Sequence, residues 1–212
     1  MYKRQIENHL GPIPTIRQRF VPSNRGSDRV ILNLPLEPGE TYELNQSILF
    51  ESGFDWGGES EGGKIGFGLG GGSLPTGGDL DKDGFTARII WDGNNNGSAA
   101  LGAYVYSANR SQNLPFGDEY LIDGFQIPTE TWVDITLVVT MNSSTDLANG
   151  SLAIWVDDEV MLWRENIQWQ SAGDVIGVDT LLYSSFYGGN SSAWAPDHTT
   201  HARVSNICYN RY

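Results

Sequence analysis

Hydrophobic and polar residues alternate along many short segments of this chain, and glycine, proline, asparagine and aspartate separate the segments. Side chains two apart in an extended chain lie on the same face, so this alternation predicts β-strands with one buried face. No segment shows the sustained helical spacing of a long amphipathic helix. The expected strands are residues 29–36, 41–51, 65–69, 85–91, 101–107, 132–141, 151–156, 180–187 and 202–209.

The number of short strands and the turn residues between them favour an all-β fold, an antiparallel β-sandwich of jelly-roll type. Asp157 and Asp158 predict a tight hairpin into a further strand at 159–164. A propeller needs an internal repeat, and none is visible. No linker divides residues 29–212, which we expect to form one domain. Residues 1–28 contain three prolines and are expected to be an irregular N-terminal segment.

The net charge of the chain disfavours some classes of binding partner. Its 212 residues include 26 acidic and 13 basic side chains, giving a net charge of −13. Such a chain is a poor partner for nucleic acid or an anionic membrane surface. A polyanionic substrate is also an awkward match, although the local field of a cleft decides binding there. No apolar run is long enough to span a membrane.

Compartment, disulfides and oligomeric state are less constrained. The first residues, Met1 to Ile6, have no apolar signal core. Cys208 is the single cysteine, so no intrachain disulfide forms, and we expect its thiol in the core. We expect a monomer.

A set of chemically reactive side chains lies in the middle of the chain. Lys64 follows two glycines, Thr86 and Arg88 share one face of a strand, and Tyr104 and Tyr106 share one face of the next strand. We expect these residues to meet on one sheet face. Each alone has an ordinary explanation, namely a solvated lysine, a charge on the wet face of a strand, and tyrosines that pack.

An acidic loop precedes the Arg88 strand. Asp79, Asp81 and Asp83 match the first half of a calcium-binding EF-hand loop, Asp-x-Asp-x-Asp-Gly. The twelfth position is Ile90 instead of the bidentate glutamate. A structural Ca²⁺ site completed by other loops and a solvated acidic turn therefore both stay open.

Two further side chains are candidates for substrate binding. Trp194 lies in a glycine-rich loop and offers a flat apolar face to a sugar ring. His198 lies three residues before His201, but no third metal ligand is visible, so we place His198 at a groove rim. The remaining tryptophans, Trp163 among them, are expected mostly in the core.

Taken in order, five short motifs resemble family 14 of the polysaccharide lyases, the alginate-lyase group with a β-jelly-roll fold. The resemblance runs from about Phe50 to the C-terminus. There are three departures: a threonine stands where the family usually has serine, Lys64 is not followed by a Leu-Pro-Gly stretch, and the acidic loop with Asp79, Asp81 and Asp83 is not expected there. The motifs are Gly62-Gly63-Lys64, Thr86-Ala87-Arg88, Tyr104-Val105-Tyr106, Phe186-Tyr187-Gly188-Gly189 and Trp194-Ala195-Pro196.

The resemblance implies an extracellular lyase that cleaves a uronic-acid polysaccharide, alginate or glucuronan, by β-elimination without a required cofactor. Arg88 and Lys64 would neutralise the substrate carboxylate. Tyr104 or Tyr106 would act as base and acid, with its pKa lowered by the cations. Thr86 would hold Arg88 or a sugar hydroxyl.

Two other functions stay open. One is a non-catalytic carbohydrate-binding jelly roll. The other is a glycoside hydrolase, which needs two opposed carboxylates on the groove; the expected strands offer no obvious pair.

Overall fold

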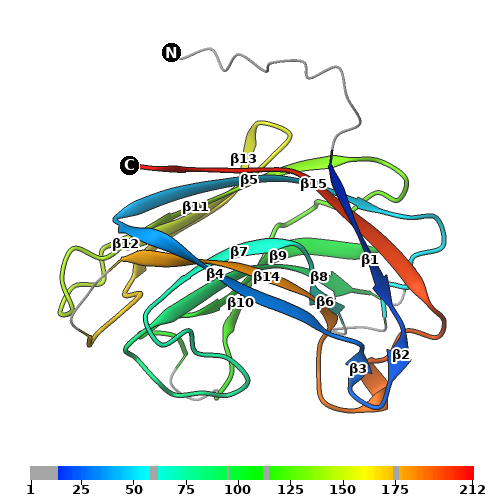
Figure 1. The fold of residues 1–212 in the computed structure, drawn as a ribbon, viewed down its shortest axis with the longest axis horizontal. Helices are drawn as coiled ribbons and strands as arrows, with labels where there is room; N and C mark the ends of the chain where they lie inside the picture. Colours follow the sequence, from blue (N-terminus) through cyan, green and yellow to red (C-terminus); the bar gives the residue numbers. More distant parts are fainter. Residues whose placement is uncertain (1–13, 58–61, 95, 112–114, 174–176) are drawn as a thin grey trace.

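The computed structural model describes residues 14–57, 62–94, 96–111, 115–173 and 177–212. Its main body is two antiparallel sheets stacked face to face (Figure 1). The first sheet has six strands in the order β1 (Thr15–Phe20), β15 (Thr200–Arg211), β5 (Thr41–Phe50), β11 (Val133–Thr140), β12 (Gly150–Val156) and β13 (Glu159–Ile167).

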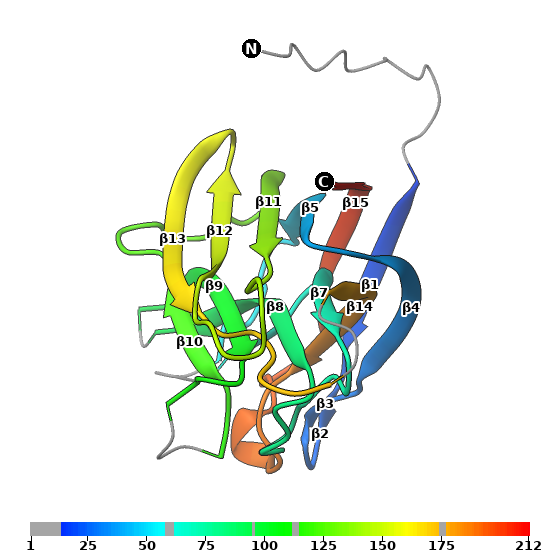
Figure 2. The ribbon, with the colours of Figure 1, turned by 90° about the vertical axis from the view of Figure 1, so that its left-hand side faces the viewer.

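The second sheet carries the residues of interest, and most of its strands are labelled in Figure 2. Strand β7 (Phe67–Gly71) joins it by pairing with two of the other strands. A small separate hairpin pairs β2 (Pro22–Ser23) with β3 (Gly26–Ser27). The main path is β10 (Asp118–Leu121), β9 (Ala99–Tyr106), β8 (Phe85–Gly93), β6 (Gly62–Lys64), β14 (Val178–Tyr187) and β4 (Val30–Gly39).

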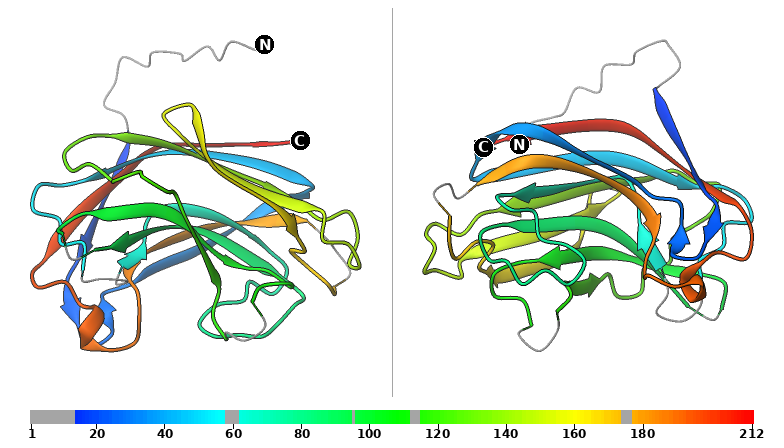
Figure 3. Two further views of the ribbon diagram at one scale, coloured as in Figure 1. Left: turned by 180° about the vertical axis from the view of Figure 1, so that it is seen from behind. Right: turned by 60° about the horizontal axis from the view of Figure 1, so that its bottom comes forward.

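The expected antiparallel jelly-roll sandwich is confirmed, and Figure 3 shows its two layers from behind and from below. Most expected strands are present with shifted ends. The hairpin at Asp157 and Asp158 is present as well: both residues have positive φ, 49° and 68°, as a two-residue turn of type I′ requires. Within the described residues, no helix is long and apolar enough to cross a membrane.

The core fills the space between the two sheets. In β8, Ala87, Ile89 and Trp91 are buried and point toward the six-stranded sheet, so the alternate residues face away from it. Trp91 is surrounded by an aromatic cluster in which Phe54 lies 5.5 Å and Tyr187 lies 5.0 Å from it, centroid to centroid. This cluster supports the sheet from behind, beneath its outer face.

The expectation of an irregular segment through residue 28 is wrong for β1. Thr15 to Phe20 pair with β15 in a continuous antiparallel register, and Phe20 is fully buried, 5.7 Å from Trp91. Burial of this ring and the ladder of backbone hydrogen bonds to β15 outweigh the nearby prolines, which lie outside the strand. We therefore propose that the domain includes β1. Residues 1–13 lie outside the described residues.

Two other side chains are exposed where a core position was expected. Cys208 is exposed on β15, because the register shifts between Ser205 and Cys208 and Asn206 adopts a φ of 53°. Trp163 is 51% exposed on β13, an edge strand of the six-stranded sheet. Neither feature has a signal in the local hydrophobic pattern.

Candidate active site

A groove with a volume of ≈ 870 Å³ lies on the outer face of the seven-stranded sheet. Four residues expected at the site line it: Lys64, Tyr104, Tyr106 and Trp194. Other charged or aromatic residues that sequence reasoning did not select as site residues also line it, among them Arg29, Asp92, Asp118, Glu119 and Phe186.

The strand register explains why these side chains meet. Arg88 on β8 pairs with Tyr104 on β9, and Tyr104 pairs with Glu119 on β10. Lys64 on β6 pairs with Phe186 on β14 on one side and with β8 on the other. Directly paired residues of an antiparallel sheet stand on the same face, so one sheet face collects all five.

Lys64 is held against two aromatic rings. Its Nζ lies 4.3 Å from the centroid of the Tyr104 ring and 5.5 Å from that of Phe186. Burial lowers the pKa of Lys64 to about 8, with further lowering by the charges of Arg88 and Arg29, while Glu119 acts in the opposite direction. A fraction of this amine is therefore neutral near pH 7, which an ordinary lysine is not.

The glycine before Lys64 has a packing reason. A Cβ on Gly63 would lie 2.3 Å from the Trp91 ring and 2.4 Å from the carbonyl oxygen of Phe186. No side chain fits there, so the Gly-Gly-Lys motif lets β6 lie directly over the aromatic cluster. The motif thus serves to position Lys64.

The two tyrosines differ in accessibility. Their ring centroids are 5.6 Å apart, and each hydroxyl accepts a backbone N–H, at 3.1 Å from Gly117 to Tyr104 and at 3.0 Å from Gly78 to Tyr106. Tyr106 is 1% exposed, whereas Tyr104 is half-buried. Burial raises the pKa of Tyr104, and the neighbouring Tyr106 raises it further. Tyr104 is the phenol that a ligand can reach.

Arg88 and Thr86 lie below the groove surface. Arg88 is 7% exposed and donates from Nη1 to the hydroxyl of fully buried Thr86 at 2.8 Å. Thr86 in turn donates to the carbonyl of Pro75 at 3.0 Å. Neither side chain is among those that line the groove. Of the two roles expected for Thr86, holding Arg88 or a sugar hydroxyl, its burial and its hydrogen bond favour the first.

The charge of Arg88 has no counter-ion among the described residues. In the described parts of the chain, no carboxylate lies within ion-pair distance of it. Burial lowers the pKa of Arg88 to about 10, although the two tyrosines counteract this, and the guanidinium stays charged at neutral pH. A positive charge thus lies beneath Tyr104 and Tyr106, directly under the groove.

Trp194 and His198 come from the same loop and take different positions. Trp194 ends the short 3₁₀ helix η1 (Ser192–Trp194) and lines the groove, packed so closely on Gly189 that a Cβ there would lie 2.1 Å from its ring. His198 is exposed, and its Nε2 lies 3.0 Å from the carbonyl oxygen of Gly53. It does not line the groove, which argues against the substrate contact expected for it.

The acidic loop uses its carboxylates for local turns. Asp79 accepts the N–H of Asp81 at 3.0 Å, and Asp81 accepts the N–H of Asp83 at 2.8 Å. The hydrogen bond from the N–H of Asp83 lowers the pKa of the Asp81 carboxyl group. Over the residues that the structure describes, no group of three or more His, Cys, Asp or Glu side chains is arranged to hold a metal ion. The contacts favour the acidic turn over the calcium site.

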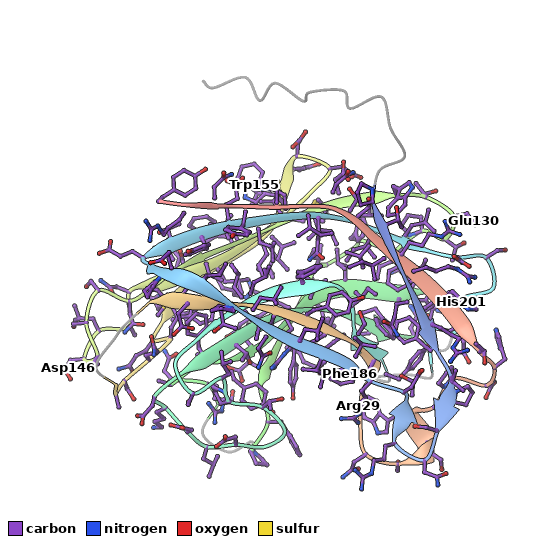
Figure 4. All side chains as sticks on the ribbon, in the orientation of Figure 1. Arg29, Glu130, Asp146, Trp155, Phe186 and His201 are labelled. Atoms are coloured by element: carbon purple, nitrogen blue, oxygen red, sulfur yellow. The ribbon has the colours of Figure 1, made fainter. Side chains whose placement is uncertain are left out.

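For most of the additional groove residues, the neighbouring sequence does not indicate that they lie at the site. The guanidinium carbon of Arg29 lies 4.8 Å from the Phe186 ring centroid, and the two side chains lie together in Figure 4. Arg29 precedes β4, far in sequence from β6 and β9. Asp92 falls one residue beyond the expected strand 85–91, but β8 extends to Gly93, and alternation within β8 puts Asp92 on the face of Arg88.

Comparison with solved structures finds the same fold in several polysaccharide lyases. The alginate lyase Aly36B superposes with a TM-score of 0.81 at 24% identity, covering 93% of this chain and 80% of that one. The alginate lyase vAL-1 from Chlorella virus superposes with a TM-score of 0.68 at 17% identity, covering 93% of this chain and 85% of that one. The endo-β-1,4-glucuronan lyase of the fungus Trichoderma reesei superposes with a TM-score of 0.59 at 11% identity, covering 97% of this chain and 89% of that one.

Sequence comparison identifies the family. No curated protein matches this chain. The family model for polysaccharide lyase 14, in contrast, matches residues 33–207, which is most of the chain. This match confirms the resemblance carried by the five motifs. The chain therefore belongs to the polysaccharide lyase 14 family.

Proposed function

We propose that this lyase cleaves a uronic-acid polysaccharide, the class that includes alginate and glucuronan, by β-elimination. One observation carries the proposal: an amine with a pKa of about 8, Lys64, lies over the accessible phenol of Tyr104 in an open groove. Family membership and the likeness to alginate and glucuronan lyases support it.

The reaction needs a base and an acid near one another. The base removes the C5 proton of the uronate, which is α to the carboxylate, and the acid protonates the departing C4 oxygen. A base works best when its pKa lies near the working pH, as that of Lys64 does. Burial raises the pKa of Tyr104, so its hydroxyl keeps its proton and suits the acid. These roles differ from the tyrosine base expected from the sequence.

Charge develops on the carboxylate as the C5 proton leaves, and fixed cations stabilise it. Arg88 supplies a positive charge from beneath the tyrosines, held in place by Thr86. Arg29 supplies a second charge within the groove itself. Because neither needs to move, little reorganisation accompanies the reaction.

An ultraviolet assay of product formation tests the proposal. Elimination creates a C4–C5 double bond conjugated with the carboxylate, and hydrolysis does not. We expect absorbance to rise with at least one member of a panel of polymannuronate, polyguluronate and glucuronan, and not with a neutral glucan. New reducing ends without absorbance would indicate a hydrolase. Binding without any cleavage would indicate a carbohydrate-binding module.

We also propose that catalysis needs no cofactor, and that the protein acts outside the cell, where such polymers occur, as a monomer. The lysine, tyrosine and arginines supply the base, acid and charge stabilisation. Activity that survives dialysis against a chelator supports the first point. A melting temperature that responds to Ca²⁺ or chelator would instead support a calcium site at the acidic loop. Light scattering measures the oligomeric state.

A further inference from the structure

The groove carries opposite charges at its two sides. Across the sheet, β4 and β14 lie on one side of β6, and β8, β9 and β10 lie on the other. Arg29 stands on the first side, against Phe186. Glu119 stands on the edge strand β10 at the second side. In strand order, Lys64 on β6 and Tyr104 on β9 lie between Arg29 and Glu119, and Asp92 lies on β8 between them.

Two more carboxylates line the groove with Glu119: Asp118, which accepts the N–H of Ser111 at 3.2 Å, and Asp92. Asp92 is half-buried at the end of β8. Burial raises the pKa of Asp92, and the negative charge of Glu119 raises it further, so the two carboxylates act on one another. Neither has a basic partner within ion-pair distance among the described residues. We call Asp92 and Glu119 the acidic side of the groove.

This arrangement bears on which sugar can lie next to the cleaved uronate. A homopolyuronate carries one carboxylate on every ring. With one carboxylate near Lys64, the adjacent ring toward β10 would bring the next toward Asp92 and Glu119. Like charges repel strongly in a partly desolvated groove. A ring without a carboxylate avoids this repulsion, and its hydroxyls can donate hydrogen bonds to the two carboxylates.

We infer that the groove takes a polysaccharide in which the cleaved uronate is bonded, on the side of Asp92 and Glu119, to an uncharged sugar. The preferred substrate is then a polymer that alternates uronate with neutral sugar, and homopolyuronates are slower substrates. This inference rests on the proposed lyase function and narrows its substrate class.

The test compares two polymers of one uronate. Glucuronan has only glucuronate, and hyaluronan alternates glucuronate, linked at C4, with an uncharged amino sugar. The ratio of kcat/KM on the two is measured for the wild type, Glu119→Gln and Asp92→Asn. The matched control is Asp146→Asn, which removes one charge from an exposed loop far from Arg29 and Phe186 in Figure 4. Melting temperatures check that each variant is folded.

We expect Glu119→Gln to raise kcat/KM on glucuronan about tenfold relative to hyaluronan, because one like-charge contact is removed. Asp92→Asn should act in the same direction, and Asp146→Asn should leave the ratio unchanged. Glu119 also raises the pKa of Lys64, but an effect through Lys64 changes both polymers equally and cancels in the ratio. An unchanged ratio in both groove variants overturns the inference.

A binding measurement separates this inference from the proposed function. If no polymer yields an unsaturated product, the lyase proposal fails, and calorimetric affinities for the same two polymers still report on the acidic side. Tighter binding of glucuronan by Glu119→Gln than by the wild type, with hyaluronan unchanged, supports the charge preference. Equal affinities of the two proteins for glucuronan overturn it.

Discussion

The Nζ of Lys64 lies 4.3 Å from the centroid of the Tyr104 ring, although β8 separates their two strands. The contact stabilises the charged amine through the face of the ring, whereas burial favours the neutral amine. Burial is the larger effect, and the pKa falls to about 8. Roughly one Lys64 in ten is then neutral at pH 7, a usable population for a base.

The lowered pKa of Lys64 leads to a prediction for the pH dependence of kcat/KM. We expect kcat/KM to rise with pH and to level off above about 8, as the amine loses its proton. Arg29 lowers this pKa, so Arg29→Gln should move the rise to higher pH. Lys64→Arg should lower kcat/KM at least a hundredfold, since a guanidinium keeps its proton. A rise that stays in place in Arg29→Gln would argue against Lys64 as the titrating group.

The two tyrosines should respond differently to the same substitution. Tyr104→Phe removes the accessible proton donor and should lower kcat/KM by about 10² to 10⁴, with a small effect on stability. Tyr106→Phe removes a buried hydroxyl that accepts the N–H of Gly78, so we expect a loss of about 1 kcal/mol of unfolding free energy and a smaller kinetic effect. Steady-state kinetics and urea unfolding measure both. Equal kinetic losses would contradict the assignment.

Thr86 should act through Arg88. Thr86→Val keeps the shape but leaves Nη1 of buried Arg88 without its hydroxyl partner, so we expect about 1–3 kcal/mol of destabilisation and a lower kcat with little change in KM. Thr86→Ser retains the hydroxyl and should restore kcat. A valine variant with normal kcat would show that Arg88 needs no positioning.

Glu51 should link stability to pH. It binds Arg17 of β1 at 2.6 Å and Arg203 of β15 at 2.7 Å, and these contacts lower its pKa to about 2. A lowered folded-state pKa stabilises the fold above the unfolded pKa, near 4.5, and this contribution is lost as pH falls toward 2. Because both arginines are about half exposed, we expect Glu51→Gln to lose about 1–2 kcal/mol at pH 7.

Urea unfolding at several pH values checks this. The difference between the wild type and Glu51→Gln should shrink steadily below pH 4.5. The control is Glu40→Gln, which changes an exposed glutamate in the turn between β4 and β5. A difference that is the same at pH 7 and pH 3 would mean that the ion pairs are not its source.

Much of the sandwich and part of the site follow from the sequence alone. Alternation in a strand depends only on backbone geometry, so residues 85–91 already place Thr86 and Arg88 on one face, as β8 does. The turn at Asp157 and Asp158 is local in the same sense. The ordered motifs were sufficient to identify the family.

The other features of the fold and the site depend on contacts between segments that are distant in the sequence, so only the tertiary structure decided them. Strand β1 forms by pairing with β15, so the prolines on either side of it led to the wrong expectation. Register and strand order brought Arg29 and Glu119 to the groove of Lys64. Alternation placed Thr86 on the correct face but could not reveal its burial or its hydrogen bonds with Pro75 and Arg88. The pKa of Lys64 likewise depends on burial and on charges from other strands, which no local pattern encodes.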